Sequence, residues 1–339
     1  MPTPLNGPVL KPDALAFLSA IHGRPCCFLR DDPAPLLAPL FRAAASAPDP
    51  RAAGGALLAD MPEGYTPAGA PAGIAVFRIY GPIVPRESYL TRYFGLTALD
   101  SFRAKLKAVA ADPGVAAILL DVDSPGGMAE GLQETAALLR AVRAEKPILA
   151  YANATCASAA YWLAAQANRL IVTPDADAIG SVGSVILQVD STEFWKQMGV
   201  TWNIIRAPER KYEGSELEPL GAVARQALQD VVNATTAQFE ADVAKGRGLS
   251  VTKVRQDFGR GAVLMAQPAV AVSMADALGT FEDAVTGALK LGKKGARRAE
   301  LPTDSITSLL SENGLVGAAV PPAPEFERLR LLSAAHAGR

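Results

Sequence analysis

The sequence VAAILLDVDSPGG, residues 115–127, is a mostly apolar run that ends in a Pro-Gly-Gly turn. An apolar run of this length, followed by turn residues, is typical of a strand that is buried on both faces of a sheet. The glycines let the chain turn sharply and let a ligand approach main-chain N–H groups, because no Cβ is in the way. An ordinary strand-to-helix turn explains the same residues. The stretch therefore predicts a central strand and leaves the role of its turn open.

Segments with strand and helix patterns alternate around this stretch. The other predicted strands are GIAVFRIYG (73–81), PILAYA (147–152) and RLIVTP (169–174). The predicted helices between them are 99–114, with Asp100 or Ser101 as a possible cap, 129–146 and 157–167. Alternation with short connections favours parallel pairing through right-handed crossovers, with helices on both faces of the sheet. The expected fold class is therefore α/β.

The remainder of the chain has a different pattern. Residues 1–70 are rich in Pro, Ala and Gly and are expected to form a loosely packed arm, whereas 71–290 are expected to form the folded domain. Residues 291–339 are expected to be a linker and a short tail. Further helices are expected at 13–22, 36–46, 219–246, 250–258, 267–277 and 325–336.

The composition excludes several classes of protein. The chain has 339 residues and a net charge of −1, which argues against nucleic acid as the main partner. It has no apolar run long enough to cross a membrane, and its first residues do not have the pattern of a signal peptide. Three cysteines and two histidines make a disulfide framework and a zinc site improbable. We expect a protein of the reducing cytoplasm that has no metal and no cofactor.

Ser158 is a lone hydroxyl where a predicted strand changes into an alanine-rich helix. A serine at a helix N-terminus faces unsatisfied N–H groups, which favour an anion forming there, and small neighbours would let a peptide approach. Serines at such positions are more often caps or packing residues. Cys156 is the rival nucleophile, although a small cysteine in apolar surroundings is usually inert.

A serine nucleophile needs a base. His22 lies in the predicted arm and His336 near the end of the chain, so either would have to fold back onto the domain. A lysine can replace histidine when burial lowers its pKa. Lys211 is the candidate, because it follows the strand-like run VTWNIIRA (200–207) and precedes a Gly-Ser turn, but a solvated loop lysine fits its spacing equally well.

Three stretches in order resemble the signal peptide peptidase A family of serine peptidases, and most of all its phage and prophage capsid-assembly branch. They are ADPGVAAILLDVDSPGG (111–127), ASAAYWLAAQANRLIVTPDADAIGSVGSV (157–185) and RKYEGSELEPL (210–220). The resemblance covers roughly residues 73–285. It implies a fold like that of the Clp protease and the crotonases, with stacked βαβ units and a helical C-terminal region.

The resemblance also implies roles for particular residues. Ser158 corresponds to the nucleophile and Lys211 to its general base. The N–H groups of Gly127 and Ala159 would form the oxyanion hole. Two supporting residues are implied as well: Gly126 in the glycine pair, and Ser181 as a residue that positions the lysine amine.

The implied activity is cleavage of a polypeptide, with a coat or scaffold protein as the expected substrate and a homo-oligomer as the expected assembly. The expected location is the host cytoplasm or the procapsid interior, with neither nucleic acid nor membrane as a partner. Two alternatives remain open. One is an inactive scaffold protein on the same fold, and the other is a crotonase-like acyl-CoA enzyme, which would not need Ser158 and Lys211 together.

Overall fold

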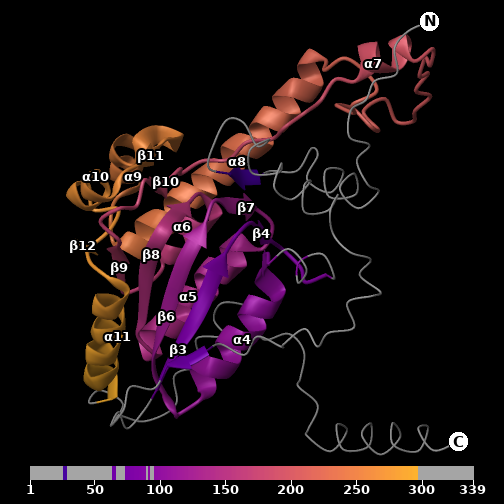
Figure 1. The fold of residues 1–339 in the computed structure, drawn as a ribbon. Helices are drawn as coiled ribbons and strands as arrows, with labels where there is room; N and C mark the ends of the chain where they lie inside the picture. The colour runs from indigo at the N-terminus through magenta and orange to yellow at the C-terminus, as the bar shows by residue number, and fades with distance from the viewer. Residues whose placement is uncertain (1–25, 29–62, 66–72, 89–90, 92–94, 297–339) are drawn as a thin grey trace, which may run out of the picture. The chain divides into compact units, whose positions relative to one another are not determined.

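The computed structural model describes residues 26–28, 63–65, 73–88, 91 and 95–296. Its larger sheet has eight strands, six of which are paired in the order β11-β10-β8-β6-β3-β2 (Figure 1). These strands are β2 (Glu63–Tyr65), β3 (Gly73–Tyr80), β6 (Val115–Ser124), β8 (Ile148–Ala157), β10 (Ala178–Gly180) and β11 (Val263–Leu264). The other two are β9 (Arg169–Val172), which pairs with β8, and β12 (Ala277–Leu278), which pairs with β9.

The centre of this sheet is parallel, as predicted. Strand β6 pairs in parallel with β3 on one side and with β8 on the other. Its apolar residues alternate between two cores: Ile118 and Leu120 belong to one, and Ala117 and Leu119 to the other. A strand that buries both faces has no position for a polar side chain along most of its length, which explains its continuous apolar sequence.

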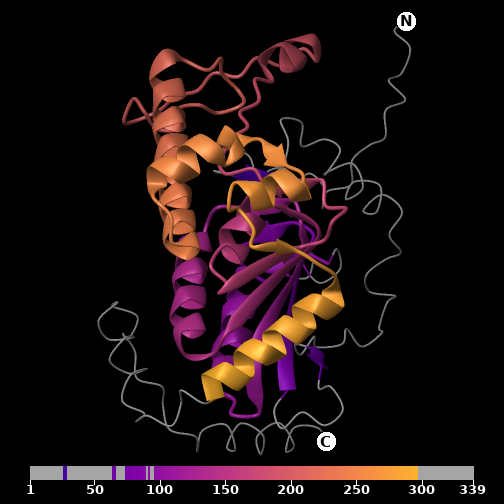
Figure 2. The same cartoon turned by 90° about the vertical axis from the view of Figure 1, so that its left-hand side faces the viewer.

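Helices cover both faces of the sheet. The α-helices of the described residues are α4 (Leu99–Ala111), α5 (Leu132–Glu145), α6 (Ala159–Ala164), α7 (Thr192–Gln197), α8 (Ala222–Arg247), α9 (Val251–Asp257), α10 (Ala266–Ala271) and α11 (Phe281–Ala296), of which α7 lies away from the sheet (Figure 1). Side chains of α4, α5, α6 and the second half of α8 pack into one core, and α11 covers the opposite face through the other (Figures 1 and 2). The predicted α/β class, with βαβ units followed by a helical C-terminal region, is therefore confirmed.

A smaller sheet lies where the central strands end. It has four strands in the order β1-β7-β4-β5. They are β1 (Cys26–Phe28), β4 (Ile83–Val84), β5 (Thr97–Ala98) and β7 (Gly126–Met128). Strand β7 follows β6 after a single residue and is in contact with helix α6, so this sheet brings the Pro-Gly-Gly turn to the start of that helix.

Some local predictions were wrong. The N-cap of α4 is Ala98, not Asp100 or Ser101, and the Asp100 carboxylate instead accepts the N–H of Glu87. Residues 200–207 form no strand, since no other strand pairs with them and Ile205 is 98% exposed. Helix α10 ends at Ala271, earlier than predicted, because turn residues 272–276 follow it and lead into β12, which extends the sheet beyond β9.

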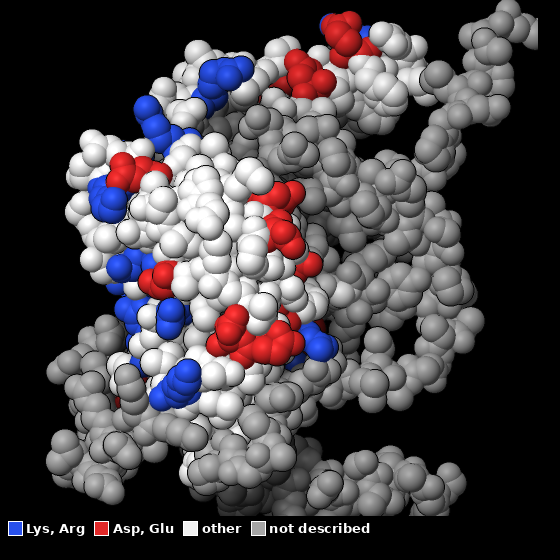
Figure 3. Space-filling model, turned by 60° about the vertical axis from the view of Figure 1, so that its left-hand side comes forward, with Lys and Arg blue, Asp and Glu red and all other residues white. Residues whose placement is uncertain are grey.

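Ion pairs lie among the C-terminal elements. Arg255 of α9 pairs with Glu240 of α8, Arg247 of α8 pairs with Asp276 just before β12, and Lys253 pairs with Asp257 within α9. On the face seen in Figure 3, Lys and Arg side chains are interspersed with Asp and Glu. Among the described residues, no helix combines the length and the apolar character that crossing a bilayer requires.

The domain limits stay a prediction. Strands β1 and β2 come from the stretch expected to be an arm, and α11 continues to Ala296, beyond the expected limit of the domain at 290. The predicted helices at 13–22, 36–46 and 325–336 lie outside the described residues.

Candidate active site

Ser158 lies at a sharp turn between strand β8 and helix α6. Its φ is 54° and its ψ is −122°, a conformation that residues with a Cβ rarely adopt. Its N–H donates to the carbonyl of Gly180, so strand β10 holds the turn in place. Strain of this kind costs about 1–3 kcal/mol and persists only where the surrounding structure enforces it.

The Ser158 hydroxyl is buried and has no hydrogen-bond partner in the structure. It does not cap α6, since no side-chain capping bond is formed there. This serine is therefore not a helix cap. Its backbone is strained and its hydroxyl forms no hydrogen bond. A buried hydroxyl without a partner lowers stability, so its presence points to a function.

The glycine strand β7 lies against the same helix. A Cβ on Gly127 would be 2.0 Å from the carbonyl oxygen of Ile83, so only glycine fits between β7 and β4. Gly126 has a φ of 103°, which also favours glycine. The structure thus brings two predicted groups together: β7, which carries Gly126 and Gly127, and the first turn of α6, which carries Ala159.

Ser124 anchors this glycine turn, a role that the sequence analysis missed. Its hydroxyl donates to the carbonyl of Gly81 at 2.6 Å and accepts the N–H of Gly126 at 3.2 Å. It is fully buried. Its position directly before the Pro-Gly-Gly turn was the available signal, but the sequence analysis considered only the glycines.

Ser181 directly follows strand β10, whose last residue, Gly180, is paired with Ala157. It is buried, has a φ of 52°, and its N–H donates to the carbonyl of Ala262. The end of β10 therefore brings Ser181 beside the end of β8 and the Ser158 turn.

The small residues after Ser158 have a packing role. Every residue of α6 is buried, because the helix packs against β8, β7, α5 and α8. Trp162 stacks on Phe239 with ring centroids 4.4 Å apart and donates its indole N–H to Asp242. A helix surrounded by neighbours on all sides has room only for small residues and a few well-packed large ones.

Cys156 does not compete with Ser158. It is fully buried in β8, and burial raises the pKa of its thiol. A thiol that remains protonated is a poor nucleophile.

Lys211 lies on a stretch that we call the exposed segment, residues 185–220 between β10 and α8. No residue from 183 to 223 is buried, and the Lys211 side chain is exposed. No hydrogen bond joins its amine to the Ser158 hydroxyl. The single chain therefore brings Ser158, the glycine strand and Ser181 together but does not join Lys211 to them. His22 and His336 lie outside the described residues.

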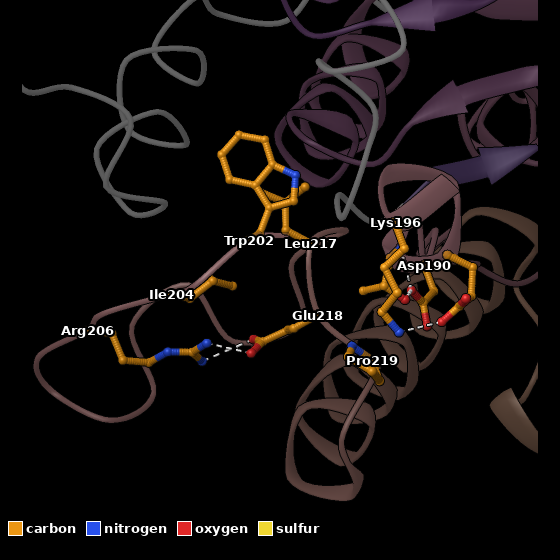
Figure 4. A pocket seen from close by; sticks show the side chains of 10 residues that line it. Asp190, Lys196, Trp202, Ile204, Arg206, Leu217, Glu218 and Pro219 are labelled. Carbon is orange, nitrogen blue, oxygen red and sulfur yellow. Dashed lines mark hydrogen bonds and ion pairs between the residues drawn. The ribbon is translucent and has the colours of Figure 1, made fainter. Parts of the chain in front are cut away.

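A pocket of about 470 Å³ lies on the exposed segment (Figure 4). Arg206 and Glu218 form an ion pair at its wall. Its lining includes neither Ser158 nor the glycine strand, so it is separate from the candidate active site. In the described part of the chain, no group of three His, Cys, Asp or Glu side chains is suited to hold a metal ion.

An unpaired serine at a strand-to-helix turn, next to a glycine strand in an α/β protein, is the arrangement expected of a serine hydrolase. Residues 140–294 match the family model of peptidase family S49. Over these residues the chain is similar to the peptidases of family S49.

Three relatives illustrate the similarity. The chain is 35% identical over 214 residues to head-tail preconnector protein GP5 of Enterobacteria phage P21, which covers 63% of this chain and 42% of that protein. It is also 35% identical over 214 residues to capsid assembly protease C of Escherichia phage lambda, and this alignment covers 63% of this chain and 48% of that protein. It is 28% identical over 238 residues to protease 4 of Haemophilus influenzae, and this alignment covers 69% of this chain and 37% of that protein. The chain thus spans less than half the length of each of these relatives.

Among solved structures, a substrate-peptide complex of the 1510-N membrane-bound stomatin-specific protease has a TM-score of 0.41 and 18% identity. That comparison covers 63% of this chain and 78% of that chain.

Proposed function

We propose that this protein is a serine endopeptidase in which Ser158 is the nucleophile and Lys211 the general base. The observation that carries the proposal is the Ser158 hydroxyl, which is buried, unpaired and held in a strained turn beside a glycine strand. The S49 domain match supports the same reaction class.

The reaction is acyl transfer. The Ser158 oxygen attacks a peptide carbonyl while the neutral Lys211 amine takes the hydroxyl proton. The N–H groups of Gly127 and Ala159 stabilise the oxyanion, a contribution of about 2.7–4 kcal/mol for each donor in comparable sites. The lysine then protonates the leaving amine, and a water activated by the same lysine releases the acyl group.

This chemistry requires Lys211 to leave bulk water. All but two of the exposed large apolar side chains in the described residues lie between Val185 and Val231, on the exposed segment and the first half of α8. Ile205 is 98% exposed and Met198 63%. We infer that a second copy of the chain covers this apolar surface, and that the protein works as a homo-oligomer in which Lys211 is desolvated.

The substrate that we propose is a phage coat or scaffold protein, and the place of action is the host cytoplasm or the procapsid interior. The support is the similarity to the capsid assembly protease of phage lambda. Ser181, which lies beside the Ser158 turn, is proposed to position the lysine amine.

The test compares the wild type with Ser158→Ala and Lys211→Ala, each co-expressed with the candidate coat protein. Intact mass reports cleavage, and circular dichroism reports folding. Both variants are expected to stay folded and to lose cleavage by a factor of about 10³ or more. Lys196→Ala is the matched control, because Lys196 is another exposed lysine of the same segment, and it is expected to cleave normally.

Loss of cleavage in Ser158→Ala but not in Lys211→Ala would rule out Lys211 as the base. Normal processing with Ser158→Ala would overturn the peptidase and favour an inactive scaffold on the same fold.

A further inference from the structure

Strand β1 occupies an edge of the glycine strand. Residues Cys26–Phe28 pair antiparallel with β7, with Cys26 opposite Met128, Cys27 opposite Gly127 and Phe28 opposite Gly126. The other edge of β7 is paired with β4 through Ile83. Strand β1 is one of the two edge strands of this sheet and covers the side of β7 that would otherwise be unpaired.

An uncovered strand edge is a binding site for an extended peptide, because its unpaired N–H and C=O groups accept an added strand. Here the edge belongs to the strand that carries Gly126 and Gly127, and that strand contacts the helix that starts after Ser158. A polypeptide added to β7 would therefore run past the candidate nucleophile.

The state of Ser158 is independent evidence for such a site. Its hydroxyl is fully buried and has no hydrogen-bond partner. A nucleophile in this state cannot meet a substrate until part of the surrounding chain moves away. Among the described strands, β1 is three residues long and is paired along one edge only, so it can be displaced at little cost.

We propose that residues 26–28 act as an autoinhibitory strand, which in the resting chain occupies the edge of β7 where a substrate polypeptide would pair. This inference rests on the proposed peptidase function. Residues 26–28 act as an internal competitor, so a substrate strand binds only after β1 has left β7.

The test weakens β1 without touching β7. Because successive N–H groups of a strand point to opposite sides, replacing both Cys26 and Cys27 by proline removes one ladder donor, whichever of the two faces β7. The matched control is Cys26→Ala with Cys27→Ala, which also removes both thiols but keeps both N–H groups.

The first readout is hydrogen exchange of the amides in residues 124–131. Exchange is expected to be faster in the proline variant than in the alanine control. Equal exchange would show that β1 does not protect β7, and it would overturn the proposal.

The second readout is cleavage of a peptide substrate. The proline variant is expected to have an apparent KM about threefold lower or more, with kcat unchanged, because a larger fraction of molecules has the site open. An unchanged KM combined with faster exchange would show that the edge of β7 does not bind the substrate.

A third readout separates this proposal from the peptidase itself. A labelled peptide of residues 22–32 is titrated into Ser158→Ala chains that carry either the proline or the alanine pair, with fluorescence anisotropy as the signal. Tighter binding to the proline chain supports the site, and equal binding overturns it. Absence of cleavage by every variant would overturn the peptidase and leave the binding result to stand by itself.

Discussion

Ser158 adopts a backbone conformation that favours glycine over residues with a side chain. Its φ of 54° results from the sharp turn between β8 and α6, and its N–H is held by Gly180. If function retains serine at this position, then the strain is a stability cost that the active site imposes on the fold.

That cost can be measured by comparing two inactive variants. In an ordinary buried position Ser→Gly is less stable than Ser→Ala, because glycine gains freedom in the unfolded chain. At a strained positive φ the order is reversed. We expect Ser158→Gly to be more stable than Ser158→Ala by about 1 kcal/mol in urea unfolding. If the alanine variant proved the more stable of the two, the turn would not be strained.

At the scale of elements, a single carboxylate joins three parts of the fold. Asp276, just before β12, accepts a hydrogen bond from each terminal guanidinium nitrogen of Arg247 in α8, both at 2.8 Å. It also accepts a hydrogen bond from the N–H of Leu170 in β9 at 2.7 Å. Burial favours a higher pKa for Asp276, but the hydrogen bonds from Arg247 and Leu170 outweigh it and lower the pKa below the usual 3.8. The ionised carboxylate therefore stabilises the folded state.

A depressed folded-state pKa gives a defined pH dependence. The contribution is complete above the usual pKa of an aspartate and is lost as the pH falls through the lower folded value. We expect Asp276→Asn to lower the free energy of unfolding by about 1–2 kcal/mol at pH 7. This figure is reduced because the ion pair is partly exposed to solvent. The difference in unfolding free energy between the two proteins is expected to be smaller at pH 3. Urea titrations of both proteins at the two pH values measure it.

Asp257→Asn is the control for this comparison. Asp257 forms an exposed ion pair with Lys253 one helical turn away, so its loss is expected to change stability by less than about 0.5 kcal/mol. If the loss of stability in Asp276→Asn were the same at pH 7 and pH 3, the charge of the Asp276 carboxylate would not be the cause of that loss.

At the scale of the whole molecule, a well-buried α/β core carries an exposed segment that has no buried residue. An exposed run of large apolar side chains is typical of a surface that another protein covers. Since Lys211 lies on this segment, self-association and formation of the proposed dyad are expected to depend on each other.

A charged residue on this surface tests that link. Ile205→Glu is expected to leave the fold intact, because Ile205 is 98% exposed, but to convert the oligomer to a smaller species and to lower peptidase activity at least tenfold. Light scattering gives the mass, and a peptide assay gives the activity. Met265→Glu is the control, since Met265 is 65% exposed but lies outside the exposed segment.

Retention of the wild-type mass in Ile205→Glu would show that this surface is not the interface. A smaller assembly that keeps its peptidase activity would show that catalysis does not depend on self-association.

The sequence by itself determined the α/β class, the central strands and most of the helices, because hydrophobic periodicity reflects which faces are buried. It also named Ser158 and the glycine pair as candidates, because a lone hydroxyl begins an alanine-rich helix and a close backbone approach restricts a turn to glycine. The tertiary structure alone decided that Ser158 is strained and does not cap a helix, that Ser124 anchors the glycine turn, and that residues 26–28 cover β7. These facts depend on contacts between distant parts of the chain, which local sequence patterns do not record. The same reason explains why spacing could not join Lys211 to Ser158: whether a lysine is desolvated depends on what packs against it.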